Sequence, residues 1–380
     1  MIYLDHHAAT PLCSAARAAM QSALAADARA TLGNPSSAHA AGRHARALLE
    51  RGREQVARAL GAAPTELVLT SGGTESCNLG LRGVLPNGTG KHVITTSIEH
   101  PAVATVIAQL ERDGARITRL ALPGGVPPSV DQLDAEITTD TALIALQWIN
   151  HETGTLLPIA QYAALCRERR VPLFVDATQA AGKVAIDLSR VPVDLLAIAS
   201  HKLGGPAGAG ALFVRKGIDV DPLVLGGAQE RGRRAGSPDV LAVVGFGAAC
   251  ERIGERLDAR LPLLALRERI ERGLRELGFV INATDGPRAA TAVNASRLGA
   301  RGPELVAALD LEGVCVSSGA ACSSGLAAPS PVLLAMHPDA PERASSALRF
   351  SLGPETTRAH VDFALEALAK VLMRNGAGAS

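Results

Sequence analysis

An acid and a lysine follow two apolar segments and could act on the same ligand. Asp176 ends the run Leu173-Phe174-Val175-Asp176, and Lys202 comes shortly after Leu195 to Ala199. A carboxylate is costly to bury at a strand end unless it pairs with a cation. That cation could be the ring nitrogen of pyridoxal phosphate (PLP), which an acid keeps protonated while a lysine forms a Schiff base. A structural salt bridge between the two side chains is the alternative, and the pair alone does not decide between them.

A glycine turn earlier in the chain could hold an anion. The turn Ser71-Gly72-Gly73-Thr74-Glu75-Ser76 lies between an apolar run and a helical pattern. Gly73 lets the backbone approach a phosphate, and Thr74 with the helix N-terminal amides could donate hydrogen bonds to it. Plain helix capping is the alternative. The turn matches neither GxGxxG nor GxxxxGK[ST], which argues against dinucleotide and Walker-type nucleotide binding.

Two further polar side chains follow predicted strands. The imidazole of His100 could stack on a flat cofactor ring and move protons, although a single histidine is more often a core or solvated residue. Asn150 ends the run from Leu143 to Ile149 and could bond a phenolic oxygen, or it could form a turn.

The C-terminal third contains a possible nucleophile. Cys322 lies in a run of small residues, Ser317 to Gly325, which predicts an exposed loop whose thiol could reach a bound substrate. We interpret the remaining cysteines as buried and inert: Cys13, Cys77, Cys166, Cys250 and Cys315. Arg349 lies between Leu348 and Phe350, where its guanidinium could bind a substrate carboxylate or form a structural ion pair.

The elements that must position these residues alternate between short apolar runs and helical patterns. We predict buried parallel strands at Leu67–Leu69, Val93–Thr95, Leu143–Ile149, Leu173–Val175, Leu195–Ala199 and Leu212–Val214. Apolar residues at helical spacing predict a long amphipathic helix from Ala45 to Leu60 and another from Ile159 to Cys166. A parallel sheet covered on both faces binds ligands beyond the carboxyl ends of its strands, so the site should lie in the strand-to-helix loops.

The pattern changes after about residue 250. A charged helical stretch reaches Leu277, and short strands near Phe279–Ile281 and Ala347–Ser351 are separated by helices near Glu304–Leu309 and Glu355–Leu372, before a loose tail from Asn375. We therefore predict an α/β fold with a mostly parallel sheet flanked by helices in a large domain, and a smaller α+β domain. The large domain would span residues 12–250, and the small domain would combine residues 1–11 and 251–380 and carry the cysteine loop.

Composition narrows the function classes. The 380 residues are 47% hydrophobic, and 38 Lys and Arg balance 37 Asp and Glu, which is typical of soluble globular proteins and makes nucleic acid an unexpected partner. No apolar run approaches the roughly 20 residues that span a bilayer, and the first residues do not form a secretory signal. We expect no membrane association and a cytoplasmic location. The cysteines form no CxxC pairs, which fits a reducing compartment and argues against a metal site.

Taken together, these motifs resemble those of the cysteine desulfurases, PLP enzymes of fold type I among the class V aminotransferases. The resemblance runs nearly from end to end, through Leu4-Asp5 with Ala8-Ala9-Thr10-Pro11, Gly33–Ser37 with His39, Ser71–Ser76, Glu99-His100, Asn150–Gly154, Val175–Gln179, His201-Lys202, Gly226–Gly232 and Arg349–Gly353. Residues Ser317–Ser324 are similar to the Ser-Ser-Gly-x-Ala-Cys loop of the subgroup with the longer, mobile cysteine loop.

The resemblance implies a set of PLP contacts. Lys202 would form the Schiff base, Asp176 would contact the pyridine nitrogen, and His100 would stack on the ring and take part in catalysis. Gln179 and Asn150 would lie near the ring hydroxyl. The phosphate contacts would come from Gly73, Thr74, Ser200, His201 and, across a homodimer, Ser237 of the neighbouring subunit.

The resemblance also implies the substrate and the reaction. Asn34 and Arg349 would bind the carboxylate of L-cysteine, and Cys322 would take its sulfur as a persulfide while alanine leaves. The sulfur would pass to an acceptor such as an iron–sulfur scaffold or a tRNA-thiolation protein. The main alternatives are a selenocysteine lyase and an aminotransferase on the same fold. A further alternative is a non-catalytic sulfur-transfer scaffold. Such a scaffold would not need the combination of Lys202, Asp176, Cys322 and Arg349.

Four positions depart from the family pattern. Ala199 replaces a serine before His201-Lys202, Ala207 and Pro101 stand where a lysine is common, and His151 replaces a second asparagine. We expect these departures to affect cofactor affinity and rate more than the type of reaction.

Overall fold

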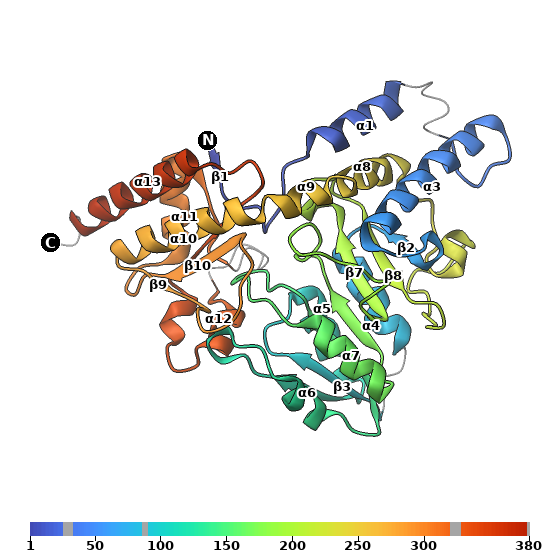
Figure 1. Ribbon diagram of the computed structural model, residues 1–380, viewed down its shortest axis with the longest axis horizontal. Helices are drawn as coiled ribbons and strands as arrows, with labels where there is room; N and C mark the ends of the chain where they lie inside the picture. The colour runs from blue at the N-terminus through green and yellow to red at the C-terminus, as the bar shows by residue number, and fades with distance from the viewer. Residues whose placement is uncertain (26–32, 86–89, 320–327, 378–380) are drawn as a thin grey trace.

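The computed structural model describes residues 1–25, 33–85, 90–319 and 328–377 (Figure 1). Seven strands of this part form the central sheet, in the spatial order β2-β8-β7-β6-β5-β3-β4. They are β2 (Leu67–Thr70), β3 (His92–Thr96), β4 (Arg116–Leu120), β5 (Thr141–Gln147), β6 (Leu173–Asp176), β7 (Leu195–Ala199) and β8 (Gly210–Val214). Neighbouring strands from β4 through β3, β5 and β6 to β7 are parallel.

The prediction of a parallel strand at Leu212–Val214 is wrong in direction. Strand β8 pairs antiparallel with both β7 and β2. Only a short loop with the 3-10 helix η3 (Ser200–Lys202) joins β7 to β8, whereas a parallel return needs a longer crossover. The sequence analysis also did not predict β4, whose two arginines lie on a partly exposed strand at the sheet edge.

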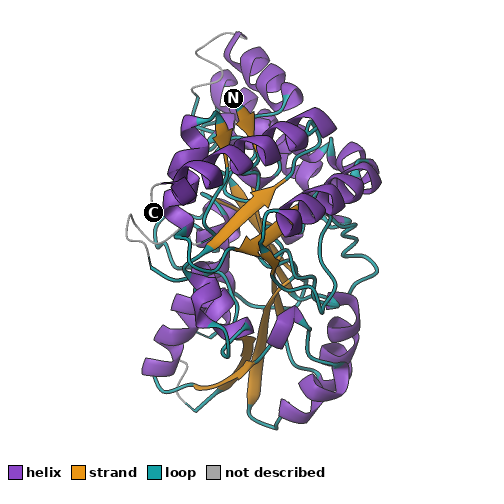
Figure 2. Ribbon diagram, turned by 90° about the vertical axis from the view of Figure 1, so that its left-hand side faces the viewer, coloured by secondary structure: helices purple, strands orange, loops and turns teal. Residues whose placement is uncertain are grey.

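Helices cover both faces of the central sheet (Figure 2). On one face, α4 (Gly73–Val84) and α5 (Pro101–Arg112) pack in a cluster with Val68 and Phe174. On the other face, α3 (Ala40–Leu60), α7 (Ile159–Arg169) and α8 (Val240–Cys250) pack in a cluster with Leu67 and Val175. Adjacent residues fall in different clusters because side chains alternate along a strand. The two predicted helices are confirmed as parts of α3 and α7.

A second set of elements builds the smaller part of the molecule, on the left in Figure 1. Strands β9 (Val280–Ile281), β10 (Ala292–Ser296) and β12 (Ala347–Ser351) form an antiparallel sheet, and β1 (Ile2–Tyr3) pairs parallel with β11 (Val314–Cys315). Its helices are α10 (Arg260–Glu276), α11 (Gly302–Leu311) and α13 (Arg358–Ala377), which share one apolar cluster with these strands. Because Leu4 joins the same cluster, we propose the division into residues 12–250 and residues 1–11 with 251–380.

The remaining elements are shorter or lie at the periphery. They are α1 (Ser14–Ala25), α6 (Val130–Glu136), α9 (Ile253–Asp258), α12 (Pro331–Met336), η1 (Pro64–Glu66), η2 (Pro123–Gly125), η4 (Gln229–Gly232) and η5 (Pro341–Ala344). In the described ranges, helices with both the length and the apolar character of a membrane span are absent.

Two smaller expectations need correction. The predicted loose tail is wrong for residues 375–377, because α13 continues to Ala377. Cys77, Cys166 and Cys250 are buried as predicted, but Cys13 and Cys315 are only half-buried. Cys315 lies on β11, which belongs to a sheet of two strands and is covered less than the central strands.

Candidate active site

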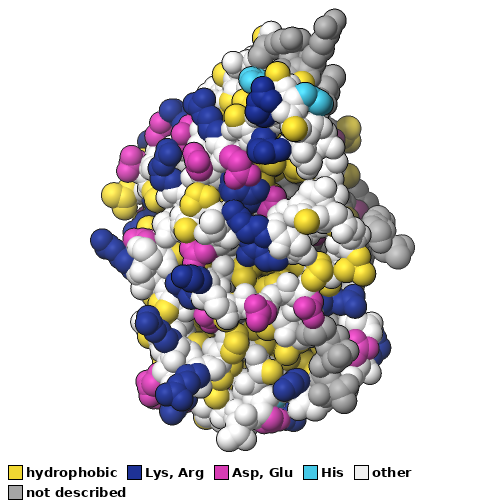
Figure 3. All heavy atoms as spheres, turned by 90° about the vertical axis from the view of Figure 1, so that its right-hand side faces the viewer, with side chains coloured by type: hydrophobic (Ala, Val, Ile, Leu, Met, Phe, Trp, Pro, Cys, Tyr) yellow, Lys and Arg dark blue, Asp and Glu magenta, His cyan; other side chains and the backbone are white. Residues whose placement is uncertain are grey.

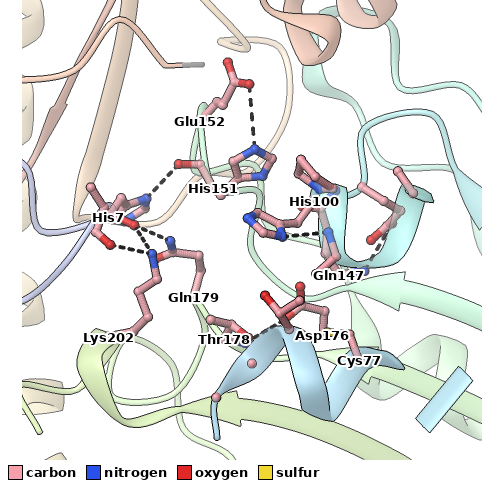
Figure 4. A pocket seen from close by; sticks show the side chains of 18 of the residues that line it. His7, Cys77, His100, Gln147, His151, Glu152, Asp176, Thr178, Gln179 and Lys202 are labelled. Atoms are coloured by element: carbon pink, nitrogen blue, oxygen red, sulfur yellow. Dashed lines mark hydrogen bonds and ion pairs between the residues drawn. The ribbon is translucent and has the colours of Figure 1, made fainter. Parts of the chain in front are cut away.

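A cavity of about 930 Å³ lies at the carboxyl ends of the central strands, where they face the small domain (Figure 4). Loops after β2, β3, β5, β6 and β7 line it from the large domain, and β12 lines it from the small domain. The structure brings these predicted site residues together in its lining: Gly73, Thr74, His100, Asp176, Gln179, His201, Lys202 and Arg349. A parallel sheet favours this location because its strand ends converge at one edge.

Lys202 and Asp176 reach the cavity from neighbouring strands. The Nζ of Lys202 donates hydrogen bonds to the main-chain carbonyls of His7, at 2.5 Å, and Ala8, at 2.9 Å. Asp176 is 6% exposed, and its Oδ1 accepts a hydrogen bond from the backbone N–H of Thr178 at 2.9 Å. The chain thus places a primary amine and a buried carboxylate at one cavity.

The glycine turn between β2 and α4 presents backbone to the cavity. A Cβ on Gly73 would lie 2.9 Å from Oγ1 of Thr178, so a side chain at this position would crowd the turn. A Cβ on Gly210 would lie 2.6 Å from the Cα of Gly72, because β8 passes close behind the turn. The first amides of α4 have no partner within the helix and are available to an anion.

Two histidines form an edge-to-face pair on the cavity wall. The ring centroids of His100 and His151 are 4.9 Å apart. Burial lowers the pKa of His100, as does Lys202, while Asp176 opposes this shift. Nδ1 of His100 accepts a hydrogen bond from the N–H of Ala102 at 3.1 Å, so the proton of the neutral ring is on Nε2. His201 is neutral as well, because burial and the nearby Lys202 lower its pKa to about 4.

Two buried acids line the cavity, and the sequence analysis gave them no role. Burial raises the pKa of Glu99 to about 8 despite hydrogen bonds from Thr96 and the N–H of Gln147. Burial also raises the pKa of Glu152, which accepts a hydrogen bond from Oγ of Ser330 at 2.6 Å. The sequence signal for a role was their position, because Glu99 precedes His100 and Glu152 lies two residues after Asn150.

His7 is the third residue that the sequence analysis missed. It lines the cavity and is almost completely buried. Its Nδ1 donates to the carbonyl of His151 at 3.2 Å, and its own carbonyl accepts from Lys202. No local pattern links the N-terminal segment to Lys202, because only tertiary contacts bring the two together.

Arg349 enters the cavity from β12. Its Nη1 donates to the carbonyl of His151 at 3.0 Å, and its Nη2 pairs with Asp5 at 2.7 Å. The side chain is 3% exposed, and its Nε has no hydrogen-bond partner among the described residues. Arg349 lines the cavity, and its guanidinium suits an anionic ligand.

Ser200 and Asn150, two of the predicted cofactor contacts, are not among the residues that line this cavity. The hydroxyl of Ser200 is fully buried and faces Gly205. The Asn150 amide is also fully buried: its Oδ1 accepts from the N–H groups of Glu152 and Thr153, and its Nδ2 donates to Ile98. Asn150 therefore shapes its own turn, and the next residue, His151, reaches the cavity.

Asn34 and Ser237 also lie away from the cavity of this chain. Asn34 is exposed before α3, and its Oδ1 accepts from the N–H of Ser36 at 2.8 Å, so the structure does not bring it to Arg349. Ser237 is exposed, and its predicted contact was to the neighbouring subunit. Cys322 lies outside the described residues, but Gly319 before it and Pro331 after it line the cavity.

Three comparisons agree with this site. Residues 2–363 match the class V aminotransferase family. The IscS-like cysteine desulfurase of Mycobacterium tuberculosis is 40% identical, over 98% of this chain and 97% of that protein. A solved structure of a NifS-like protein has a TM-score of 0.89 at 30% identity, covering 98% of this chain and 99% of the other. The structure of SspA in complex with cysteine has a TM-score of 0.80 at 30% identity, covering 94% and 100%.

The chain therefore belongs to the class V aminotransferases and, within them, to the cysteine desulfurase family. It is an enzyme with the fold type I architecture, as predicted. Members of this family use PLP.

The cavity of this chain fits PLP by its own donor set. Phosphate requires N–H and O–H donors, which the glycine turn, Thr74 and neutral His201 supply. A protonated ring nitrogen requires a buried carboxylate, which Asp176 supplies, and the aldehyde requires a primary amine, which Lys202 supplies. A side chain at Gly73 or Gly210 would collide with neighbouring atoms, so both positions of the glycine turn region require glycine.

Proposed function

We propose that this enzyme removes sulfur from L-cysteine with PLP, releasing alanine and leaving a persulfide on Cys322. One arrangement carries the proposal. The cavity joins Lys202 and Asp176 of the large domain to Arg349 of the small domain, and the residues on either side of the Cys322 segment line the same space.

In this proposal the chain holds PLP through groups already at the cavity wall. Gly73, Thr74 and His201 bind the phosphate, Asp176 holds the proton of the ring nitrogen, and Lys202 binds the aldehyde. Bound PLP supplies an electron sink, and the protein supplies geometry and protonation states. Burial keeps His100 neutral, so its Nε2–H can donate a hydrogen bond toward a bound substrate.

Arg349 binds the substrate carboxylate and so directs the substrate sulfur toward the Cys322 segment. The thiolate of Cys322 attacks that sulfur, and an S–S bond forms as the Cβ–S bond of the substrate breaks. The electron pair of the broken bond stays on Cβ, which takes up a proton and leaves in alanine. The thiolate is the reactive form of cysteine, so this step requires a deprotonated Cys322.

We further propose a homodimer in which Ser237 contacts the phosphate of the neighbouring subunit. The segment 221–237 projects at the right-hand edge of Figure 1, and it exposes Leu223, Val224 and Leu225, the last to 80%. Figure 3 views this side of the molecule, where basic and apolar side chains are interspersed. Light scattering should return the mass of two chains, and PLP retention should fall on dilution. A monomer that holds PLP tightly would contradict the dimer.

The persulfide sulfur would pass to an acceptor protein, such as an iron–sulfur scaffold or a tRNA-thiolation protein. We propose a cytoplasmic location for this transfer. Every cysteine in the described residues is free, and a persulfide on Cys322 survives only where oxidants do not compete for the thiol.

The experiment that tests the function compares Cys322→Ser with Cys315→Ser. Cys322→Ser should keep its visible PLP absorption but release no sulfide, because a hydroxyl cannot accept sulfur as a persulfide. Cys315→Ser, a half-buried strand position on β11, should keep most activity. Mass spectrometry after one turnover without reductant should find one added sulfur on Cys322. Full alanine production by Cys322→Ser would overturn this mechanism and favour a selenocysteine lyase, whereas full turnover without alanine or sulfide would favour an aminotransferase.

A further inference from the structure

A second lysine lies directly behind the wall of the active-site cavity. Lys183 is half-buried and lines a small neighbouring cavity together with His6 and Arg256. Burial lowers its pKa well below the usual range, and the cations Lys202, Arg256 and Arg349 add to this effect. Nothing in the proposed reaction uses this amine directly.

Lys183 is connected to the cavity through Gln179. The Nζ of Lys183 donates to Oε1 of Gln179 at 2.5 Å, and Nε2 of Gln179 donates to the carbonyl of His7 at 2.8 Å. The same carbonyl accepts from Nζ of Lys202 at 2.5 Å. Gln179 is 5% exposed and lines the cavity near Lys202 (Figure 4), and its amide bonds Lys183 and the His7 carbonyl.

The two partners of Gln179 allow only one orientation of its amide. A main-chain carbonyl can only accept, so the NH₂ group must face His7. The amine of Lys183 donates, so the amide oxygen must face Lys183. One N–H of the amide is used on His7, and the other has no partner among the described residues. Without Lys183 the amide oxygen would lose its partner, and only the bond to the His7 carbonyl would hold the amide in place.

We propose that Lys183 is a positioning residue that holds Gln179 with an amide N–H toward the cavity, where it donates to the anionic ring oxygen of PLP. The inference rests on PLP as the proposed cofactor. A donor at this oxygen stabilises its negative charge, whereas an amide oxygen there would repel it. Lys183 thereby fixes the direction in which Gln179 donates without touching the cofactor.

A pH titration of the visible absorption of the PLP-loaded protein tests the inference. The visible absorption of PLP bound through Lys202 would change when a proton is lost near the ring oxygen, and a donor to that oxygen would favour this loss. Lys183→Met should therefore raise the midpoint of the titration, by on the order of one pH unit. Gln179→Leu, which removes the donor itself, should raise it by a similar amount.

The double variant separates positioning from a direct effect of the Lys183 amine. If Lys183 acts through Gln179, Lys183→Met should add no shift in the Gln179→Leu background. Additive shifts, or a wild-type midpoint in Lys183→Met, would overturn the inference and leave the cofactor proposal intact. Wild-type protein that takes up no PLP would overturn both.

Two further variants complete the design. Arginine at position 183 can only donate, so Lys183→Arg should keep the wild-type midpoint. If Lys183→Met does not fold, a shifted midpoint in folded Lys183→Arg would contradict the inference. Lys216→Met removes an exposed lysine just after β8 and should change neither the midpoint nor the stability. A merely structural role for Lys183 would lower the unfolding temperature of Lys183→Met without moving the midpoint.

Discussion

Asp5 and Arg349 form an ion pair that fixes the guanidinium at the cavity wall, with Oδ1 and Nη2 2.7 Å apart. Asp5 comes from the N-terminal segment and forms a parallel β-bridge with Ser351, the last residue of β12. With Nη1 held by the carbonyl of His151, two sides of the guanidinium are bound by the protein. Arg349 lines the cavity in this fixed position, which suits a guanidinium that binds a carboxylate.

Arg349→Lys should therefore weaken substrate binding more than turnover. An ammonium cannot span Asp5, His151 and a carboxylate with one fixed geometry. Loss of one charged hydrogen bond predicts a KM for L-cysteine that is higher by roughly 10- to 100-fold. Steady-state kinetics measure this, with Arg358→Lys on the exposed surface of α13 as the matched control. An unchanged KM would remove Arg349 from the substrate site.

Lys202→Ala should abolish covalent attachment of PLP. In wild-type protein, borohydride reduction and peptide mapping should locate the cofactor on Lys202, because its Nζ lies at the cavity with Asp176. Lys183 lines a different cavity, and Lys216 is exposed. A label on either of these lysines would contradict the assignment of Lys202.

Glu99→Gln should stabilise the protein at alkaline pH and not at acid pH. The folded state keeps Glu99 protonated up to about pH 8, whereas the unfolded chain releases this proton near pH 4.5. The unfolded state therefore binds fewer protons between these values, and stability falls as pH rises through this window. Glutamine carries no such proton and can keep the bonds from Thr96 and Gln147.

Urea unfolding at pH 5 and pH 8 measures this difference. The advantage of Glu99→Gln in free energy of unfolding should be small at pH 5 and on the order of 4 kcal/mol at pH 8. Glu54→Gln, on the exposed face of α3, should show no such change between the two pH values. Equal stability of Glu99→Gln and wild type at pH 8 would show that Glu99 is ionised in the folded protein.

Arg53 and Glu230 should be strongly coupled in stability. Both of their side chains are about 95% buried, and two hydrogen bonds of 2.7 Å join them. Glu230 and Arg231 have φ angles of 48° and 58°, so this anchor holds a strained turn before Ser237. Glu230→Ala leaves a buried guanidinium unpaired and should lower the free energy of unfolding by about 3 kcal/mol.

Denaturant unfolding of the single and double variants tests the coupling. Arg53→Met with Glu230→Met should cost less than either single change, because no charge remains unpaired. The exposed pair Arg119 and Glu111 is the comparison, and its removal should cost less than about 1 kcal/mol. Additive losses at Arg53 and Glu230 would contradict the coupling.

Much of the fold could be read from local patterns. Apolar runs predicted six central strands, and helical spacing predicted α3 and α7, because burial on a sheet or on a helix face imposes a period on the sequence. The positions of Asp176, His100 and Lys202 after strands were enough to expect one site, since parallel strand ends meet at one edge of a sheet. The direction of β8 was not predictable in the same way, because the apolar pattern of a buried strand is the same in both directions.

The sequence by itself determined which chemical groups stand at the strand ends, and the tertiary structure decided which of them share the cavity. Ser200 and Lys202 are neighbours in one short turn, yet the serine faces Gly205 while the lysine reaches His7. The amide of Asn150 is hydrogen-bonded within its own turn, and His151 lines the cavity wall instead. Lys183 is connected to Lys202 through Gln179 and the main-chain carbonyl of His7 in the N-terminal segment. The physical reason is that side-chain direction and long-range contact depend on how distant segments pack, which local spacing does not encode.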